Sequence, residues 1–224
     1  MKILSIDWDY FFPDNTPYDW GAHESNWVFY EIVWSARCSA QNIITKADML
    51  EEYIPNIPEN FWSIVTNKPK IIVADSHCQI WNQLPRNSTV YNLDAHHDCG
   101  YHEKDHVDCS NWGQYGLLLD KIKKLKVFYP TWRRNSPESK PLFGPSSTDY
   151  GLPRKQKFDL IFVCRSSCWT PPWWDPTFDD FLSKSGLEIE KLDDLVKKHR
   201  NLPFEQALKL RDQFRVMQEQ VLVQ

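Results

Sequence analysis

The chain has 224 residues and a formal net charge of −4, and its length suits one domain with a substantial hydrophobic core. The basic residues form no stripe, which argues against nucleic acid as a partner, and no apolar stretch is long enough to span a membrane. The N-terminal segment MKILSIDWDYF carries two aspartates where a secretory signal would be apolar, so we expect a cytoplasmic protein. The six cysteines include no CxxC pair, which argues against a zinc knuckle or a disulfide framework.

Apolar runs alternate with helical patterns in the first third of the chain. Residues 2–8 predict a buried strand, and a loop rich in breaking residues follows. Helical periodicity predicts helices over 24–37 and 45–54. Residues 68–77 predict the next strand, and a short helix is expected to follow it through Trp81.

The middle of the chain repeats this pattern. Residues 88–98 predict a strand that ends in acids and histidines, and 112–123 predict a helix. The lysine-rich segment 121–126 is expected to be a solvated helix end leading into a strand over 125–130. Residues 131–157 show no periodicity and predict a long loop over a site.

The last third begins with a predicted strand over 157–167 and a rigid aromatic loop over 168–175. Two helices are expected, over 186–199 and 203–222, and the second could pack on the chain itself or on a partner subunit. Strands that alternate with helices predict an α/β fold with a mostly parallel sheet. With no internal repeat or clear linker, the prediction is a single domain over 1–224.

Three of the predicted strands end in acidic and histidine side chains. In open α/β sheets, sites form outside the carboxyl ends of the strands, so parallel neighbours would bring these side chains together. The residues concerned are Asp7, Asp9, Asp75, His77, Asp94, His96, His97 and Asp98.

Spacing within these segments favours a shared site. Alternate residues of an extended segment point the same way, so Asp7 and Asp9 can face one site together. Asp94, His96 and Asp98 can likewise converge if their segment stays extended. The alternative is that such residues serve as helix caps and turn formers, which is a common role for Asp after a strand.

A mixed, oxygen-rich ligand set suits two Mn²⁺-like ions better than structural zinc, which prefers thiolate and imidazole. Four carboxylates brought together without a cation would be very costly. The metal ligands predicted from the residues are Asp7, Asp9, His77, Asp94, His96 and Asp98.

DAHHD at 94–98 resembles the DAHxD motif of the arginase (ureohydrolase) superfamily. The segment ILSIDWDYF at 3–11 is similar to that superfamily's SxDxDxxDP segment, and VADSH at 73–77 takes the place of its GGDHS segment. The resemblance implies a three-layer α/β/α sandwich. Because the acidic segment comes first here and after DAHxD in arginases, it also implies a circularly permuted chain.

The chain resembles most closely the branch of peptide arginases that act on ribosomally synthesised precursor peptides. This resemblance implies a hydrolase with two Mn²⁺ ions that converts arginine side chains of a peptide to ornithine and releases urea. It implies that Asp98 holds the attacking hydroxide and that His77, Asp94, Asp98 and Asp7 or Asp9 share the ions with His96.

Acid–base and substrate residues are less closely defined by the sequence. A histidine is expected to protonate the leaving amine, and the candidates are His97, His102 and His106, although His97 could instead point into the core. Arg165 could orient substrate or form a plain salt bridge, and three tryptophans could line a peptide groove or pack under the C-terminal helices. These tryptophans are Trp169, Trp173 and Trp174.

Other functions remain open at this stage. A small-molecule ureohydrolase such as an agmatinase, or a metal-dependent deacetylase, would use the same framework. A two-metal phosphoesterase would need cationic groups for phosphate, for which Arg165 is the one candidate. A non-catalytic peptide-binding protein would keep the fold without the reaction.

Overall fold

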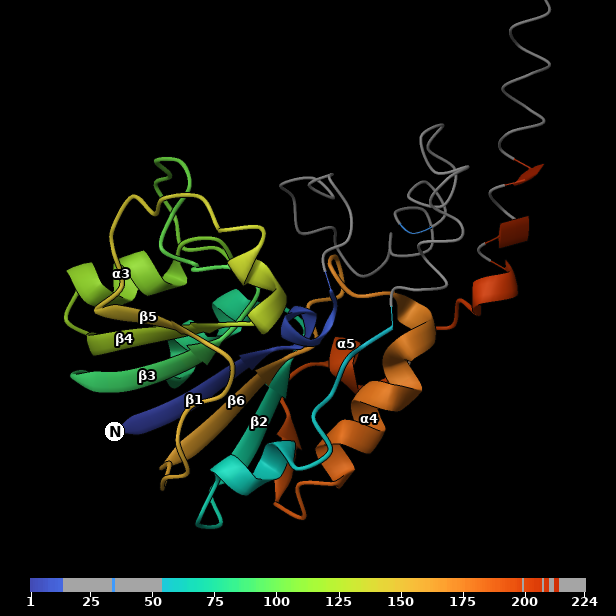
Figure 1. Ribbon diagram of the computed structural model, residues 1–224, viewed down its shortest axis with the longest axis horizontal. Helices are drawn as coiled ribbons and strands as arrows, with labels where there is room; N and C mark the ends of the chain where they lie inside the picture. Colours follow the sequence, from blue (N-terminus) through green and yellow to red (C-terminus); the bar gives the residue numbers. More distant parts are fainter. Residues whose placement is uncertain (14–33, 35–53, 199, 207, 210–211, 214–224) are drawn as a thin grey trace, which may run out of the picture.

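The computed structural model of the chain describes residues 1–13, 34, 54–198, 200–206, 208–209 and 212–213. Its centre is one seven-stranded sheet with the strand order β5-β4-β3-β1-β6-β2-β7 (Figure 1). Every strand pairing in this sheet is parallel. The predicted α/β fold with a parallel sheet is therefore confirmed.

The strands are β1 (Lys2–Asp7), β2 (Lys70–Ala74), β3 (Ser88–Leu93), β4 (Ile122–Tyr129), β5 (Ser147–Tyr150), β6 (Leu160–Cys164) and β7 (Ile189–Lys191). The α-helices are α3 (Trp112–Leu118), α4 (Asp175–Ser183) and α5 (Asp194–Lys197). Short 3-10 helices are η1 (Trp8–Phe11), η4 (Phe61–Ile64), η5 (His77–Gln83), η6 (Thr131–Arg134) and η7 (Pro172–Trp174). The short helix expected after 77 is thus present, as a 3-10 helix.

Helices cover both faces of the sheet because the strands are apolar on both sides. Leu4 and Ile6 of β1 belong to a core cluster that includes Phe181 of α4. Ile3, which points to the opposite face, belongs to a second cluster that includes Trp112 of α3. Figure 1 shows α3 and α4 on different sides of the sheet.

Three predictions of secondary structure are wrong. The expected loop 131–157 contains β5, and the lysine-rich segment 121–126 lies mostly in β4 rather than at a helix end. The expected helix 186–199 is replaced by β7 and α5. Both missed strands lie at the edges of the sheet, where one side of the strand has no partner and the sequence need not be apolar.

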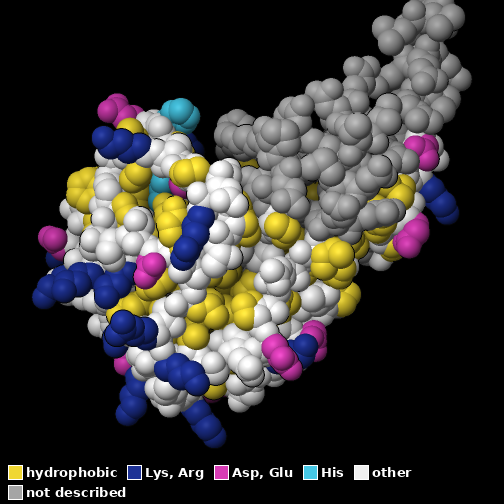
Figure 2. Space-filling model, viewed as in Figure 1, with side chains coloured by type: hydrophobic (Ala, Val, Ile, Leu, Met, Phe, Trp, Pro, Cys, Tyr) yellow, Lys and Arg dark blue, Asp and Glu magenta, His cyan; other side chains and the backbone are white. Residues whose placement is uncertain are grey.

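The helices predicted over 24–37 and 45–54 lie outside the described residues, apart from Trp34 and Ile54. Of the predicted helix 203–222, the described part is helical at 204–206, 208–209 and 212–213. None of the helices in the described part of the chain has the length and apolar character needed to cross a membrane. On the face shown in Figure 2, Lys and Arg side chains project along the left and lower left of the molecule.

Candidate metal centre

Six side chains from the ends of three strands meet at one edge of the sheet. Strands β1 and β3 pair with Ile6 opposite Leu93, so Asp7 and Asp94 follow at the same level. His77 comes from η5 after β2 and reaches across β6, where its ring stacks on Phe162 with an interplanar angle of 5°. We call these six residues the ligand cluster: Asp7, Asp9, His77, Asp94, His96 and Asp98.

One half of the ligand cluster surrounds the imidazole of His77. Asp7, His77 and Asp94 offer ligand atoms that all lie within 4.8 Å of one another. The Nδ1 atom of His77 is 3.1 Å from Asp7 Oδ2, 3.1 Å from Asp94 Oδ2 and 2.9 Å from Asp98 Oδ2. Three carboxylates therefore converge on one nitrogen, in a part of the protein closed to water.

The other half is built around His96. Asp9, Asp94 and His96 also offer ligand atoms within 4.8 Å of one another. His96 Nδ1 lies 2.9 Å from Asp9 Oδ2 and 3.7 Å from Asp94 Oδ1. The side chain of His96 is 32% exposed, whereas the other ligand side chains are buried, so the cluster meets solvent at His96. Asp94 belongs to both halves, with one carboxylate oxygen facing each.

The chemistry of these donors fits a bound metal ion. His77 Nδ1 and Asp9 Oδ2 are buried and make no hydrogen bond, although oxygen or nitrogen atoms surround both. Buried polar atoms in native proteins are almost always satisfied, so a lone pair left free among other ligand atoms needs a partner. Four buried carboxylates also outnumber the two imidazoles. A cation would satisfy the free atoms and balance this charge.

The pKa values of the carboxyl groups reflect their crowding. Burial and the charges of Asp9 and Asp94 raise the pKa of Asp7 to about 7, against the lowering effect of His77. Burial and the charge of Asp94 likewise raise the pKa of Asp98 well above its usual value. Burial and crowding therefore disfavour the ionised form of both groups.

The pKa values of His77, His96 and Asp94 shift in the directions that favour the charged form of each group. Burial by itself lowers the pKa of His77, but Asp7, Asp94 and Asp98 outweigh it and the pKa rises well above 6.5. The pKa of His96 also rises, because Asp9 and Asp94 outweigh burial. The two imidazoles in turn outweigh burial at Asp94 and lower its pKa.

The local backbone explains how the ligands converge. Asp7 caps η1 by accepting a hydrogen bond from the Asp9 amide at 3.1 Å, so its capping role and its place in the cluster coexist. Asp94 accepts from the His96 amide at 2.7 Å. The segment 94–98 is not extended as expected, because Asp98 has a φ of 52°. This left-handed turn brings the Asp98 carboxylate to His77.

Polar neighbours hold the ligand side chains in place by hydrogen bonds, as the residues around metal ligands commonly do. These neighbours were not predicted from the sequence, since each comes from a strand interior, helix or loop with no motif of its own. The contacts are Ser5 Oγ to His77 Nε2 (2.7 Å), Trp112 Nε1 to Asp98 Oδ2 (2.6 Å), Asn92 Nδ2 to Asp94 Oδ2 (3.0 Å) and Ser166 Oγ to Asp7 Oδ2 (3.0 Å).

The three candidate acid–base histidines differ in placement. His102 is exposed, and His106 is exposed and pairs with Asp105, so neither joins the ligand cluster. His97 is buried and stacks on Tyr101 with ring centroids 4.3 Å apart. Its Nδ1 accepts from the Cys99 amide at 3.0 Å, and its Nε2 makes no hydrogen bond.

A buried carboxylate in the segment after η6 was also missed. The Glu138 side chain is 9% exposed and lies 3.3 Å from Arg133 Nη2. Its charge raises the pKa of His96 and opposes the lowering of the pKa of His97 by burial, which places it near both rings. Arg133 Nε donates to the Ala95 carbonyl at 2.8 Å, so this segment is tied to the DAHHD turn. The sequence predicted a long loop over a site at 131–157, which includes Glu138, but it did not identify this residue.

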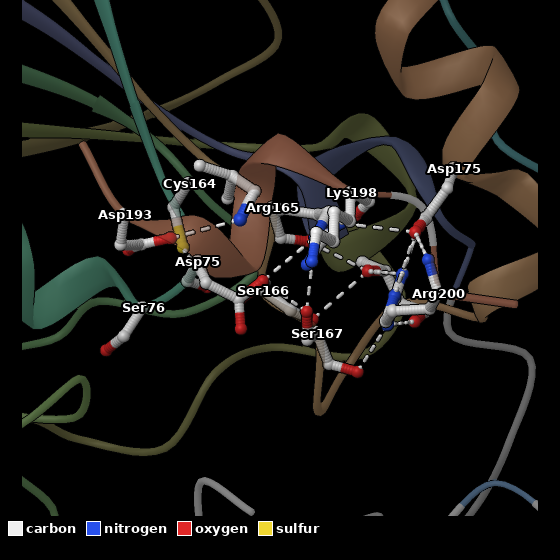
Figure 3. Close-up of polar contacts among 12 residues, drawn as sticks. Asp75, Ser76, Cys164, Arg165, Ser166, Ser167, Asp175, Asp193, Lys198 and Arg200 are labelled. Carbon is white, nitrogen blue, oxygen red and sulfur yellow. Dashed lines mark hydrogen bonds and ion pairs between the residues drawn. The ribbon is translucent and has the colours of Figure 1, made fainter. Parts of the chain in front are cut away.

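Arg165 is the centre of a second buried charge cluster (Figure 3). Its Nε donates to Asp75 Oδ1 at 2.8 Å, and its Nη1 donates to Asp175 Oδ2 at 3.2 Å. Arg200 Nη2 donates to Asp175 Oδ1 at 2.6 Å. These contacts favour the salt-bridge alternative for Arg165 over a substrate contact. We call Asp75, Arg165, Asp175 and Arg200 the arginine brace.

The three tryptophans have different neighbours. The ring of Trp169 lies 5.8 Å from that of His96, at the exposed side of the ligand cluster. Trp173 packs on Phe204 with centroids 5.1 Å apart, and Trp174 packs against the core on the α4 side of the sheet. Of the three, Trp169 is therefore the one beside a ligand, and the others match the packing alternative.

Comparison of the chain with models of protein families, with curated proteins and with solved structures finds no match.

Proposed function

We propose that this chain is a two-metal hydrolase that converts arginine side chains of a peptide to ornithine and urea. The observation that carries the proposal is the pair of ligand groups that share Asp94. A carboxylate with one oxygen facing each group is suited to hold two neighbouring cations. The resemblance of DAHHD and of ILSIDWDYF to the arginase superfamily supports the same reaction, on a permuted chain.

The two halves of the cluster define which residues would hold each ion. His77, Asp7 and Asp98 would hold one ion together with Asp94, and Asp9 and His96 would hold the other with Asp94. Oxygen-rich sites with one imidazole per ion suit Mn²⁺. When bound, such ions lower the pKa of a water molecule and so supply a nucleophile at neutral pH.

The reaction adds the oxygen of water to the guanidinium carbon and breaks the bond between that carbon and the side-chain nitrogen. The departing nitrogen must gain a proton to leave as the amine of ornithine. Asp98 would orient the attacking water. Of the three candidates, His97 is the one buried beside the ligand cluster, and because its Nδ1 accepts a hydrogen bond from the Cys99 amide, its Nε2 is the atom that would exchange the proton.

Charge favours a cationic substrate. Two Mn²⁺ ions would balance the four carboxylates of the ligand cluster, and Glu138 adds a further buried carboxylate near His96 and His97. Trp169 stands beside His96, where the cluster meets solvent, and an indole face can hold a cation or a peptide side chain. These features support a peptide substrate that approaches from the His96 side.

A mass spectrum tests the proposal. The full-length protein is incubated with Mn²⁺ and, in separate reactions, an arginine-containing peptide, free arginine and agmatine. Each product is examined for loss of CH₂N₂, and Asp98→Ala serves as the inactive control after its fold is checked by circular dichroism. Loss from the peptide that Asp98→Ala abolishes is the expected result.

Other outcomes point elsewhere. Loss of CH₂N₂ from a small molecule alone would keep the metal site and replace the peptide with a small-molecule substrate. No loss from any substrate, with Mn²⁺ bound, would contradict the proposal and favour a deacetylase or a non-catalytic peptide-binding protein.

A further inference from the structure

The loop 165–171 connects the ligand cluster to the arginine brace. Ser166 Oγ donates a hydrogen bond to Asp7 Oδ2 at 3.0 Å. The same Asp7 oxygen lies 3.1 Å from His77 Nδ1, so Ser166 holds the oxygen that faces the cluster. Trp169 of this loop lies beside His96. One short loop therefore contacts ligands in both halves of the cluster.

The backbone of Ser166 is fixed in an unusual conformation. Its φ is 55°, in the left-handed region that a residue with a Cβ adopts only at a cost. Its amide donates to the Asp75 carbonyl at 3.0 Å, and its carbonyl accepts from the amides of Trp169 at 2.8 Å and Thr170 at 3.0 Å. These bonds hold the strained residue and aim its hydroxyl at Asp7.

Arg200 holds the loop from the C-terminal side (Figure 3). Its side chain is buried, and Nη1 donates to the carbonyls of Ser167 and Thr170, each at 2.7 Å. Its Nε and Nη2 donate to Asp175, which begins α4. A guanidinium has five N–H donors in a fixed fork, so one side chain can bind two carbonyls and a carboxylate together.

We propose that Ser166 is a positioning residue for the metal ligand Asp7, and that Arg200 acts on the metal centre through it. The inference rests on the metal site of the proposed function, and it does not depend on the reaction. Removal of a donor that orients a metal ligand typically changes metal affinity by about 10- to 100-fold. The C-terminal segment would thus set the affinity of the metal centre although it supplies no ligand.

The first test compares two substitutions at the same position by Mn²⁺ binding, measured from the electron paramagnetic resonance signal of free Mn²⁺. Ser166→Ala keeps the Cβ and its backbone strain and removes only the hydroxyl. Ser166→Gly removes the hydroxyl and also relieves the strain. We expect both to weaken Mn²⁺ binding by about tenfold, while the metal-free Tm of the glycine variant exceeds that of the alanine variant. If the glycine variant instead bound Mn²⁺ more tightly than the alanine variant, in line with its higher Tm, the role of Ser166 would be purely structural and the proposal would be overturned.

The second test asks whether Arg200 acts through Ser166. Arg200→Lys keeps the charge but loses the fork, so we expect weaker Mn²⁺ binding in the wild-type background. In the Ser166→Ala background the same change should have at most about half of that effect on log Kd, because coupled residues are not additive. An equal loss in both backgrounds would show that Arg200 acts by another route and would overturn that part of the proposal.

Matched controls separate these effects from general damage. Ser63→Ala and Arg154→Lys make the same chemical changes at exposed positions and should leave Mn²⁺ affinity unchanged. If the wild-type protein binds Mn²⁺ and Ser166→Ala binds it equally well, the inference fails and the proposed function stands. If the wild-type protein binds no Mn²⁺, the proposed function fails and this inference fails with it.

Discussion

The ligand cluster and the arginine brace are both buried charge clusters at the carboxyl ends of the strands, yet they are balanced differently. The brace joins two carboxylates to two guanidiniums, and its ion pairs are 2.6 to 3.2 Å long. The ligand cluster has four carboxylates, two imidazoles and buried atoms without a partner. A cluster that is neutral within itself can serve as structure, whereas one with excess negative charge and free lone pairs is suited to hold a cation.

The largest expected effect comes from the carboxylate that both halves of the ligand cluster share. Asp94→Ala should remove a ligand from both ions, so its loss of Mn²⁺ affinity should exceed the roughly 100-fold change typical of an outer-shell residue. Product formation should fall at least as far. Calorimetric titration with Mn²⁺ checks this, with Asp149→Ala on the exposed edge strand β5 as the control. A variant that still bound metal in both halves would contradict the shared role of Asp94.

Substitution in the arginine brace should lower the stability of the protein rather than its metal affinity. Asp175→Asn leaves two buried guanidiniums short of a partner and should lower the free energy of unfolding by about 3–5 kcal/mol. Asp180→Asn, in the same helix, removes an exposed partner of Lys184 and should cost under about 1 kcal/mol. Urea denaturation of both variants measures the difference. Equal losses would mean that the brace contributes no more than a surface ion pair.

Metal removal distinguishes the role of the ligand cluster from that of the arginine brace within one protein. If Mn²⁺ binds the folded chain alone, as the proposed function requires, metal at about 100 times its Kd should stabilise the protein by about 2.7 kcal/mol. Addition of a chelator should therefore lower the Tm of the wild-type protein. It should leave the Tm of Asp94→Ala unchanged, because that variant retains the brace but not the site.

The pH dependence of metal binding follows from the raised pKa values in the ligand cluster. Asp7, Asp98, His77 and His96 all hold their protons to a higher pH than usual in the metal-free protein. A metal ion must displace these protons, so affinity should rise between pH 6 and pH 8, by about tenfold per pH unit for each net proton released. Calorimetry in buffers of different ionisation enthalpy counts the protons. Affinity that is constant across this range would count against these four groups as ligands.

The smallest effect concerns a single N–H group beside the site. Trp112→Phe keeps an aromatic ring in the core but removes the donor to Asp98, and should weaken Mn²⁺ binding by about tenfold. Trp62→Phe also removes an indole hydrogen bond, to the Phe181 carbonyl, at a distance from the ligands. The control should therefore lose only stability, by about 1 kcal/mol. An equal change of affinity in both variants would contradict a specific role for Trp112.

The parallel sheet and the ligand cluster could be predicted because local signals carry both. Short, mostly apolar segments define the central strands, and the acids and histidines follow three of them closely in the sequence. His77 was predicted as a ligand because it follows closely after the end of a strand. The prediction did not require β2 to be next to β1, and β6 in fact lies between them. The convergence of Asp98 was predicted for the wrong reason, since a left-handed turn and not an extended segment brings it in.

The remainder depends on contacts between distant parts of the chain. The strand β7 has three residues in a segment whose pattern is helical, and only its pairing with β2 defines it. Arg200 and Ser166 lie in no motif, and their roles arise from hydrogen bonds to residues far away in sequence. Glu138 is surrounded by polar residues, and its burial could be found only from the packing of the chain after η6.

The position of β1 has a consequence for local opening of the protein. This strand is fourth of seven in the sheet and is hydrogen-bonded on both sides, to β3 and β6. Central strands exchange their amide hydrogens most slowly, whereas edge elements open with little free energy. We therefore expect the amides of β1 to be among the last to exchange. Fraying of β5 or β7 would then leave Asp7 and Asp94 side by side, so a partly opened molecule would keep this part of the ligand cluster assembled.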